Sequence, residues 1–457
     1  MEEIGGISGL GPERVTENDL INDEADFFTA PVVDDTAELA RECIYSPMQS
    51  LNQQGQLTFV IPGEAGYYID PNTIRLVGKF CVKGINNENA LVALTEDNTV
   101  SIANLIGSSL FNSITCTMNG INVSFVETNN THYKAYLQNV ATYCSDAANT
   151  HMIASGFLMD TAGSFDTHNA ASSGNLTRAG WVNKSKSVGF SSWVHCDLLE
   201  TNHLLLDNMG MTLNFNRTKD DWVLLSASTN KGKFALQLEK LELRLNKVEL
   251  QPKVRNSIES RLALGQRARY PIIRSQIKIY NVPAQNDSFN WSNAIFGQLP
   301  FMVTVGMVEQ AAYSGTIEKN GFNFQNFGVT DFWYTKNNYS MPAAHYRPTW
   351  DDRGYLIEYR MMNDYFHGGR HNAGDRITPE LFKDGVTLFP MDFTAHRCAG
   401  YHRHSMGSGT ISVNATFKKA LDKAVTVILY AAYYDEYQID ANRIVYAVTD
   451  DKATPIG

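Results

Sequence analysis

The sequence predicts an all-β chain built from two tandem antiparallel jelly-roll β-sandwiches, joined by a short helix and carrying long loops. Three observations lead to this fold class. Short runs of alternating apolar and polar residues, bounded by turn residues, recur in both halves of the chain. Long helical patterns are few, and no strict short repeat indicates a solenoid or propeller. Residues 234–282 read as strand, helix and strand, as expected of a joint between two similar sandwiches of about eight strands each.

The joint begins with residues 234–250, where apolar side chains recur at every second position. This period is typical of a β-strand with one buried face. The phase slips at Glu239-Lys240 and again at Asn246-Lys247, and a β-bulge at each place would restore the apolar face. The sequence therefore predicts one long strand with two bulges.

A short helix is predicted next. Pro252 suits a first helical turn, apolar residues recur at a four-residue step up to Leu262, and Gly265 can end the helix. Residues 270–282 then alternate again and predict the first strand of the second half.

The first half contains seven strand candidates: residues 56–61, 74–82, 114–118, 121–125, 188–199, 211–216 and 222–227. The third and fourth flank Asn119-Gly120, which predicts a tight hairpin because both central residues tolerate positive φ. Residues 104–111 predict a short helix or turn, and residues 132–148 predict a helix. Residues 160–186 are rich in Ser, Thr, Asn and Gly and predict a long surface loop.

The second half repeats this organisation. Its strand candidates are residues 270–282, 300–309, 322–334, 386–393, 409–417 and 425–434. Residues 339–379 predict a long variable region with a helix near residues 356–366.

The net charge of −10 is concentrated at the N-terminus. Residues 1–42 hold 12 acidic and 2 basic residues, so the remaining chain has 36 of each. We expect residues 1–45 to be an acidic arm, either an interaction tail or a solvated leader. A neutral body disfavours tight, nonspecific binding of nucleic acid.

The six cysteines form no C-x-x-C pair and lie mostly in apolar runs, which predicts buried free thiols in a protein that folds inside the cell. No basic segment followed by an apolar one indicates a secretory signal. The longest apolar run, residues 424–434, is well short of the ~20 residues that span a bilayer.

Motifs for catalysis are absent from the sequence: it has no P-loop, no dinucleotide-binding glycine motif, no nucleophile elbow and no H-E-x-x-H. The best metal candidate combines His396, Cys398, His402 and His404, but its spacing does not match structural zinc sites, and an exposed loop is favoured. Residues 367–371 indicate a glycine-rich loop tip rather than an anion-binding nest. The acid pairs Asp351-Asp352 and Asp450-Asp451 favour solvated turns over acid/base catalysis, because adjacent side chains on an extended chain point apart. We therefore predict no catalytic residue, no metal and no cofactor.

The joint is basic. Its cations are Lys253, Arg255, Arg261, Arg267, Arg269 and Arg274. A solvated helix face with Glu259 as a local partner is the simpler interpretation. The alternative is that this strip receives the acidic arm of a neighbouring subunit, or faces nucleic acid.

Short sequence pieces spread from about residue 55 to 448 resemble those of capsid proteins from Polinton (Maverick) elements and adintoviruses. In the first half they are Ile61-Pro62-Gly63, Tyr68-Ile69-Asp70, Met118-Asn119-Gly120, Tyr133-Lys134-Ala135-Tyr136, Asp160-Thr161-Ala162-Gly163, His195-Cys196-Asp197, Leu205-Leu206-Asp207-Asn208 and Arg217-Thr218-Lys219-Asp220. In the second half they are Tyr270-Pro271-Ile272, Phe296-Gly297-Gln298-Leu299-Pro300, Lys319-Asn320-Gly321-Phe322-Asn323-Phe324 and Ile439-Asp440-Ala441-Asn442-Arg443. The acidic arm and the histidine-rich residues 396–404 depart from the pattern of these capsid proteins.

The resemblance implies a double jelly-roll major capsid protein without enzymatic activity. Such a protein forms a homotrimer that is a pseudo-hexagonal capsomer of an icosahedral shell around double-stranded DNA. Its partners would be neighbouring capsomers and a minor (penton) capsid protein, with DNA nearby but not bound by sequence and with no membrane span. It would be located in the virion after assembly inside the host cell, with residues 160–186 and 339–379 crowning its outer end.

The expected boundaries are an arm over residues 1–45, a first jelly roll over 46–251, a connecting helix over 252–268 and a second jelly roll with a C-terminal tail over 269–457. One alternative function is a minor vertex, penton or spike protein. Another class is a carbohydrate-binding or carbohydrate-processing sandwich, with Trp333, Tyr334 and Trp350 as aromatic candidates and, for hydrolysis, two carboxylates about 5–10 Å apart.

Overall fold

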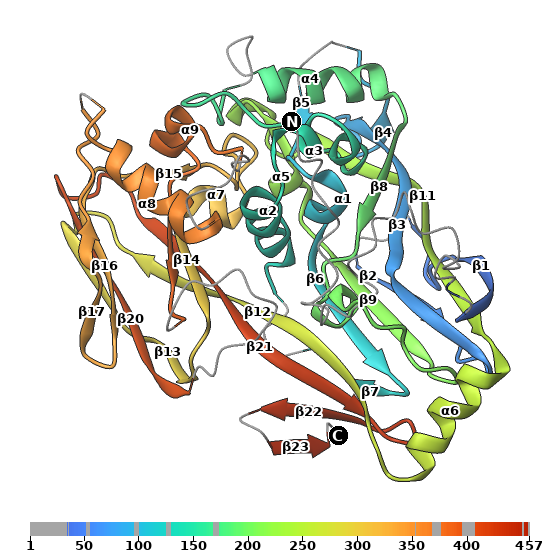
Figure 1. The fold of residues 1–457 in the computed structure, drawn as a ribbon. Coiled ribbons are helices and arrows are strands. Elements are labelled where there is room, and N and C mark those ends of the chain that lie inside the picture. Colours follow the sequence, from blue (N-terminus) through green and yellow to red (C-terminus); the bar gives the residue numbers. More distant parts are fainter. Residues whose placement is uncertain are drawn as a thin grey trace, which may run out of the picture.

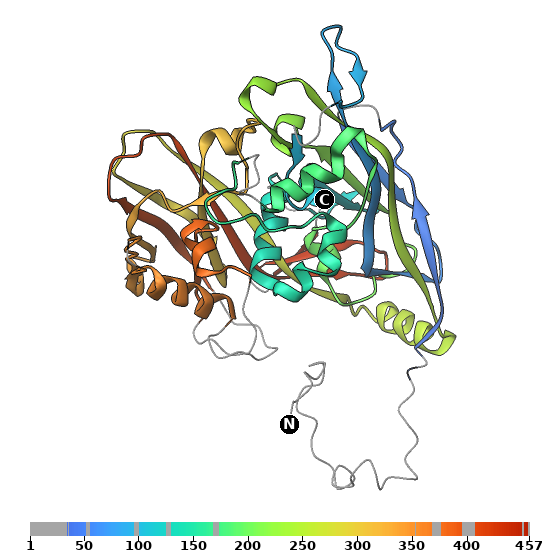
Figure 2. The same cartoon turned by 90° about the horizontal axis from the view of Figure 1, so that it is seen from above.

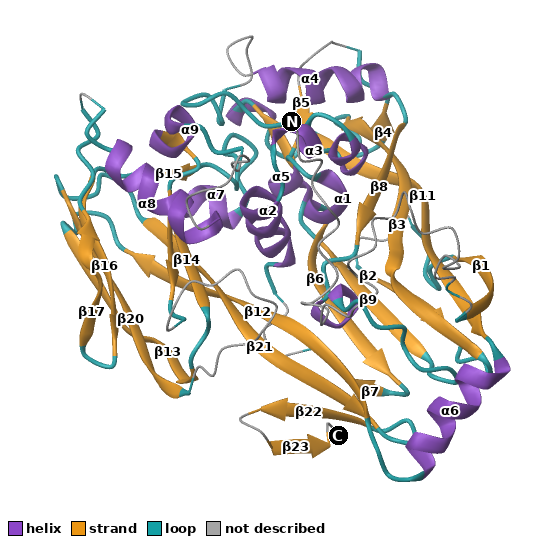
Figure 3. Ribbon diagram, viewed as in Figure 1, coloured by secondary structure: helices purple, strands orange, loops and turns teal. Residues whose placement is uncertain are grey.

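The computed structural model describes residues 34, 36–51, 55–95, 100–124, 129–167, 173–351, 353–367, 376–394, 407–449 and 452–455. Within these residues the chain forms two antiparallel β-sandwiches that stand side by side (Figures 1 and 2). Strands run along most of the height of both sandwiches (Figure 3). The predicted fold class, two jelly rolls in tandem joined by a short helix, is confirmed.

The first sandwich packs two sheets face to face. One sheet has the order β1-β11-β3, with β4 and β8 both pairing with β3, and its strands are β1 (Ala37–Tyr45), β3 (Tyr67–Ile85), β4 (Leu91–Val92), β8 (Val188–Trp193) and β11 (Phe234–Leu250). The other sheet, in the order β2-β9-β6-β7, contains β2 (Gln56–Ile61), β6 (Phe111–Met118), β7 (Ile121–Asn122) and β9 (Met211–Arg217). A short pair lies beside them, β5 (Val100–Ile102) with β10 (Leu224–Ser226).

The second sandwich repeats the plan. One sheet has the order β19-β14-β21-β22-β23 with β12 on the other side of β21, and its strands are β12 (Ala268–Val282), β14 (Met302–Glu309), β19 (Leu388–Asp392), β21 (Val425–Ile439), β22 (Val445–Thr449) and β23 (Lys452–Pro455). The facing sheet, in the order β13-β20-β16-β17, contains β13 (Ser288–Gln298), β16 (Val329–Lys336), β17 (Tyr339–Tyr346) and β20 (Ser408–Phe417). A short pair joins β15 (Phe324–Gln325) to β18 (Asp384–Gly385).

The helices gather at one end of the molecule, with α6 at the opposite end (Figure 1). They are α1 (Ile106–Ser109), α2 (Thr131–Thr142), α3 (Ser145–Ala148), α4 (Ser173–Val182), α5 (Asp220–Val223), α6 (Pro252–Ala263), α7 (Gln310–Ser314), α8 (Leu356–His367) and α9 (Pro379–Lys383). Single 3₁₀ turns occur at η3 (His151–Ser155), η4 (Asn183–Ser185), η5 (Asp197–Glu200) and η6 (Ser228–Asn230). We call the two ends the helical end and the α6 end.

The joint follows the sequence prediction, except at the second bulge. The register between β11 and β3 shifts between Leu238 and Lys240, which confirms the first bulge. The second shift falls between Arg244 and Asn246, but there the extra residues belong to β3, at positions 71–74, where Pro71 has no N–H to donate. The burial pattern slips because Lys247 is itself buried, and its ammonium is satisfied there by donating to the Pro62 carbonyl at 3.0 Å.

Other predicted elements are confirmed at their places. The hairpin of β6 and β7 turns at Asn119 and Gly120, whose φ values are 48° and 83°. Helix α6 starts at Pro252, and Gly265, with φ of 82°, follows its end. The predicted helices over residues 132–148 and 356–366 are α2 with α3, and α8.

Five sequence predictions need correction. Residues 37–45, assigned to the acidic arm, form the edge strand β1, which main-chain hydrogen bonds hold to β11 although most of its side chains are exposed. Residues 160–186 are not only a surface loop, because they contain helix α4, whose buried face includes the polar Asn175 and Arg178. Residues 188–199 are only partly a strand, because they end in η5. Residues 222–227 are also only partly a strand, because they begin in α5. Residues 322–334 are two short strands rather than one, and β13 and β17 were not predicted.

Two hydrophobic cores fill the molecule. The smaller one lies inside the second sandwich. The larger one fills the first sandwich and also includes side chains of the second half, among them Phe322, Phe324 and Tyr437. In this shared region the Tyr136 and Phe322 rings stack with centroids 4.1 Å apart. The two sandwiches therefore share a core, and their relative orientation is set by packing.

Candidate functional site

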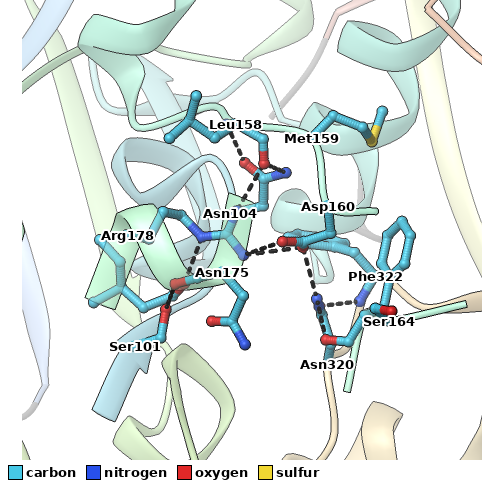
Figure 4. A network of polar contacts seen from close by, with 12 residues as sticks. Ser101, Asn104, Leu158, Met159, Asp160, Ser164, Asn175, Arg178, Asn320 and Phe322 are labelled. Atoms are coloured by element: carbon cyan, nitrogen blue, oxygen red, sulfur yellow. Dashed lines mark hydrogen bonds and ion pairs between the residues drawn. The ribbon is translucent and has the colours of Figure 1, made fainter. Parts of the chain in front are cut away.

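A buried polar network joins the two halves at the helical end (Figure 4). Its centre is the Arg178–Asp160 ion pair, in which both side chains have no exposed surface. Arg178 Nη2 donates to both carboxylate oxygens of Asp160, at 3.0 and 2.9 Å. Its Nε and Nη1 donate to the backbone carbonyls of Ile102 and Leu158, at 2.9 and 2.7 Å. A buried guanidinium is tolerable here because its donors meet acceptors in a fixed geometry.

The second half of the chain enters this network through Asn320. Its amide Nδ2 donates to Asp160 Oδ2 and to the Phe165 carbonyl, each at 3.3 Å. Its backbone N–H donates to Asp166 Oδ1 at 2.8 Å, and the neighbouring Lys319 forms an ion pair with Asp166 at 3.1 Å. Segments about 160 residues apart are thus held together by charge-assisted hydrogen bonds.

A second polar link joins α2 to β12 through Asp197. Lys134 on α2 donates to Asp197 at 2.5 Å, and Asp197 accepts from the Ser275 hydroxyl on β12 at 2.8 Å. Burial opposes the charge on Lys134, but Asp197 and Glu200 outweigh it, so the pKa of Lys134 is raised. The Lys134 side chain is therefore charged at neutral pH.

A third link lies at the α6 end. Arg443, which follows β21, donates to Asp207 Oδ1 at 2.6 Å and to Glu259 Oε1 on α6 at 2.8 Å. Tyr270 connects the same region, since its hydroxyl donates to the Leu204 carbonyl at 3.1 Å. The three links therefore connect the two halves of the chain at three separate places.

These links use the short pieces on which the family resemblance rests. The pieces around Asp160 and Asn320 meet in the first link, those around Lys134 and Asp197 in the second, and those around Asp207 and Arg443 in the third. Each piece is weak alone in the sequence, but the fold brings them together in pairs. The role of Arg178 was not predicted from the sequence, where its only signal is the spacing of Asn175, Arg178 and Val182 on one face of a helix.

A groove of about 610 Å³ opens between the two sandwiches. Its walls are mainly apolar and come from both halves, with Trp193 and Ile273 about half exposed. Among its described lining residues the one carboxylate is that of Glu200. Burial, and then the charge of Lys134, lower the pKa of the adjacent His195 to about 3, so this imidazole is neutral at pH 7. The groove offers apolar contact area, and its described lining residues do not include the paired carboxylates of a glycosidase.

Most of the chemical candidates from the sequence lie outside the part of the chain that the structure describes. His396, Cys398, His402 and His404 lie outside the described residues, as do 368–371, Asp352, Asp450 and Asp451. Asp351 is exposed and pairs with Lys418 at 3.2 Å. Among the residues that the structure describes, no group of three His, Cys, Asp or Glu side chains could hold a metal ion.

The aromatic candidates for carbohydrate binding serve other roles. Tyr334 is fully buried, and its hydroxyl donates to the Phe389 carbonyl. The Trp350 indole donates to the Val329 carbonyl at 2.8 Å, and Trp333 stacks on His345. These three residues therefore do not line one groove.

The cysteine and membrane predictions can be compared with the described part of the chain. There, Cys43, Cys81, Cys116, Cys144 and Cys196 are free thiols, and Cys81, Cys116 and Cys196 are buried, whereas Cys43 and Cys144 are partly exposed. Contact with Cys196, together with burial, raises the pKa of the Cys116 thiol well above its usual value. Cys398 lies outside the described residues. None of the described helices combines the length and apolar character needed to cross a bilayer.

Comparison with solved structures identifies the same architecture in viral capsids. The chain is similar to one in the cryo-EM structure of the Sputnik virophage, with a TM-score of 0.59, 12% identity and coverage of 98% of this chain and 93% of that one. The mavirus major capsid protein gives a TM-score of 0.53 at 10% identity, covering 97% and 96%. The Faustovirus major capsid protein gives 0.52 at 9% identity, covering 91% and 92%. These similarities establish the double jelly-roll fold over nearly the whole chain.

Sequence comparison adds one relative. An uncharacterized protein of Caenorhabditis elegans is 19% identical over 413 residues, covering 88% of this chain and 96% of that protein. No protein-family profile matches the chain.

Proposed function

We propose that this chain is the major capsid protein of a viral particle and has no enzymatic activity. The observation that carries the proposal is the double jelly roll itself, which matches capsid proteins over nearly the full length of both chains. Capsid building requires a stiff block with extended side faces, and the three polar links and the shared core supply stiffness. The polar groups of the three links hold the sandwiches together, which fits assembly rather than catalysis.

The capsomer we propose is a homotrimer. Three copies of a two-sandwich block place six similar sandwiches around a threefold axis, and such a pseudo-hexagonal unit can tile a shell. We further propose an icosahedral particle around double-stranded DNA, with neighbouring capsomers and a minor penton protein as partners. The protein would be located in the virion after assembly inside the host cell.

The proposed organisation of the chain follows the sheets. Residues 46–251 form the first jelly roll, to which β1 adds an edge strand, and residues 252–268 connect it to the second roll over 269–457. The apolar groove around Trp193 and Ile273 supports the proposal, because an exposed apolar surface of this kind suits contact with another subunit.

The solution mass of the purified protein tests this function. A trimer has three times the chain mass of 51.0 kDa and should persist on dilution, and electron microscopy should show pseudo-hexagonal blocks. A pentamer would instead favour the minor vertex protein. A stable monomer at every concentration would contradict both assignments.

A further inference from the structure

Helix α6 and the turn after it carry a concentrated positive charge. Residues 252–267 contain Lys253, Arg255, Arg261 and Arg267, and the one acid among them is Glu259. Glu259 is already bound by Arg443 at 2.8 Å. We call the four cations the α6 cationic surface.

The α6 cationic surface lacks acidic partners within the described residues. None of the ion pairs among the described residues involves any of these four side chains. Lys253, Arg261 and Arg267 are exposed, and Arg255 is partly exposed. Arg267 is held in place by stacking on the Tyr446 ring, 3.8 Å from its centroid. The surface is therefore available to an anionic partner.

The chain itself contains a matching anion. Residues 1–33, which we call the N-terminal segment, hold eight acids and one base. The first residues of β1 fix where this segment leaves the sandwich. The Thr36 carbonyl accepts a hydrogen bond from the Gln251 N–H at 3.0 Å, and Ala37 pairs with Leu250. The segment thus leaves directly beside Pro252, the first residue of α6, where the helix dipole adds positive potential.

We propose that the N-terminal segment binds the α6 cationic surface of its own chain. A 12-residue helix is about 18 Å long, and 33 extended residues span up to ~110 Å, so the tether imposes no geometric limit. The short connection gives the segment an effective concentration on the order of millimolar at the surface, which favours the copy on the same chain. This inference depends on charge and connection and not on the proposed capsid function.

Binding of a labelled peptide with the sequence of residues 1–33 tests the proposal. The proteins are the full chain, a variant lacking residues 1–33, and that shortened variant carrying Lys253→Gln, Arg255→Gln, Arg261→Gln and Arg267→Gln. A matched control carries Lys186→Gln, Lys231→Gln, Lys233→Gln and Lys419→Gln instead. Three of these control cations lie near the Phe234 end of β11, opposite to α6.

The peptide should bind the shortened protein and its matched control equally at about 0.1 M salt. Raising salt to about 1 M shortens the Debye length from ~10 to ~3 Å and should weaken binding at least tenfold. The four substitutions on the α6 surface should also weaken it at least tenfold. The full chain should bind the peptide about tenfold more weakly than the shortened one, because its own segment competes. The proposal is overturned if the peptide binds the full chain as tightly as the shortened chain. It is also overturned if the four substitutions on the α6 surface leave peptide binding to the shortened chain unchanged.

Zero-length carbodiimide cross-linking provides a test without substitutions. In the full chain, the Lys253 amine should cross-link to a carboxylate of residues 1–33, and high salt should suppress the product. A mixture of isotopically light and heavy chains distinguishes binding within a chain from binding between chains. Products linking light to heavy chains as often as chance predicts would contradict the assignment to the same chain.

Discussion

The buried joint can be tested by replacing Arg178 with methionine. Arg178→Met keeps a long unbranched side chain but removes four hydrogen bonds to Asp160, Ile102 and Leu158. The Leu158 carbonyl keeps a donor, since Asn104 Nδ2 lies 2.7 Å from it. The main loss is therefore the cation that neutralises the fully buried carboxylate of Asp160.

Removing one partner of a buried ion pair typically costs about 3–5 kcal/mol. Asn320 Nδ2 still donates to Asp160 at 3.3 Å, so we expect a value near the lower end, about 3 kcal/mol. Guanidinium chloride unfolding followed by tryptophan fluorescence measures the change in the free energy of unfolding. The control is Arg261→Met on the exposed side of α6, which should change that free energy by less than about 0.5 kcal/mol.

A double variant separates charge from packing. In Asp160→Leu with Arg178→Met, neither charge of this pair remains, so at least half of the lost stability should return. The reasoning is refuted if Arg178→Met costs less than about 1 kcal/mol, or if the double variant is no more stable than the single one.

Three further predictions follow from other buried groups. Burial lowers the pKa of His132 to about 3 from an unfolded value of 6.5. Between these two pH values the imidazole is therefore protonated in the unfolded state and neutral in the folded state. Stability should fall as pH drops from 6.5 toward 3, and His132→Gln should make the melting temperature less dependent on pH over that range. The same pH dependence in the variant and the parent protein would contradict this prediction. Gly306→Ala would place a Cβ 2.5 Å from the Phe324 ring and should lower the free energy of unfolding by about 1–3 kcal/mol. Gly180→Ala, in open space on α4, should instead raise it by about 0.5–1 kcal/mol; guanidinium chloride unfolding measures both changes. Lys134→Met should cost about 3 kcal/mol by leaving the Asp197 carboxylate without its cation, against no measurable change for the exposed Lys186→Met.

Strands β2 and β11 were predictable because their burial is mostly one-sided. In β2 and β11, apolar side chains enter the core at every second position, and that period is independent of which strand lies alongside. The hairpin at Asn119-Gly120 was predictable for an equally local reason, since two residues with positive φ are needed there. Local chemistry determined these elements, so the sequence was enough.

The missed elements depend on contacts made across the fold. Strand β1 exposes most of its side chains, and its main-chain bonds to β11 leave no periodic trace in its sequence. Helix α4 buries Asn175 and Arg178. Polar residues of this kind predict an exposed helix face, and their burial depends on the distant Asp160, which accepts from Arg178. The register of β3 near Pro71 likewise depends on its partner strand.

The same contrast explains how the resemblance could be informative without any catalytic motif. Under the proposed function the chain has no reacting atoms to hold, so the side chains that fix its two sandwiches against each other carry strict geometric demands. Lys134, Asp160 and Arg443 each lie in a short piece that is weak alone, and each meets a residue of a distant piece, in an ion pair for Lys134 and Arg443 and in a hydrogen bond from Asn320 for Asp160. A small tilt at this joint would be multiplied around a threefold block and across a tiled shell. Rigidity between the sandwiches is therefore the property that the proposed function needs most from this sequence.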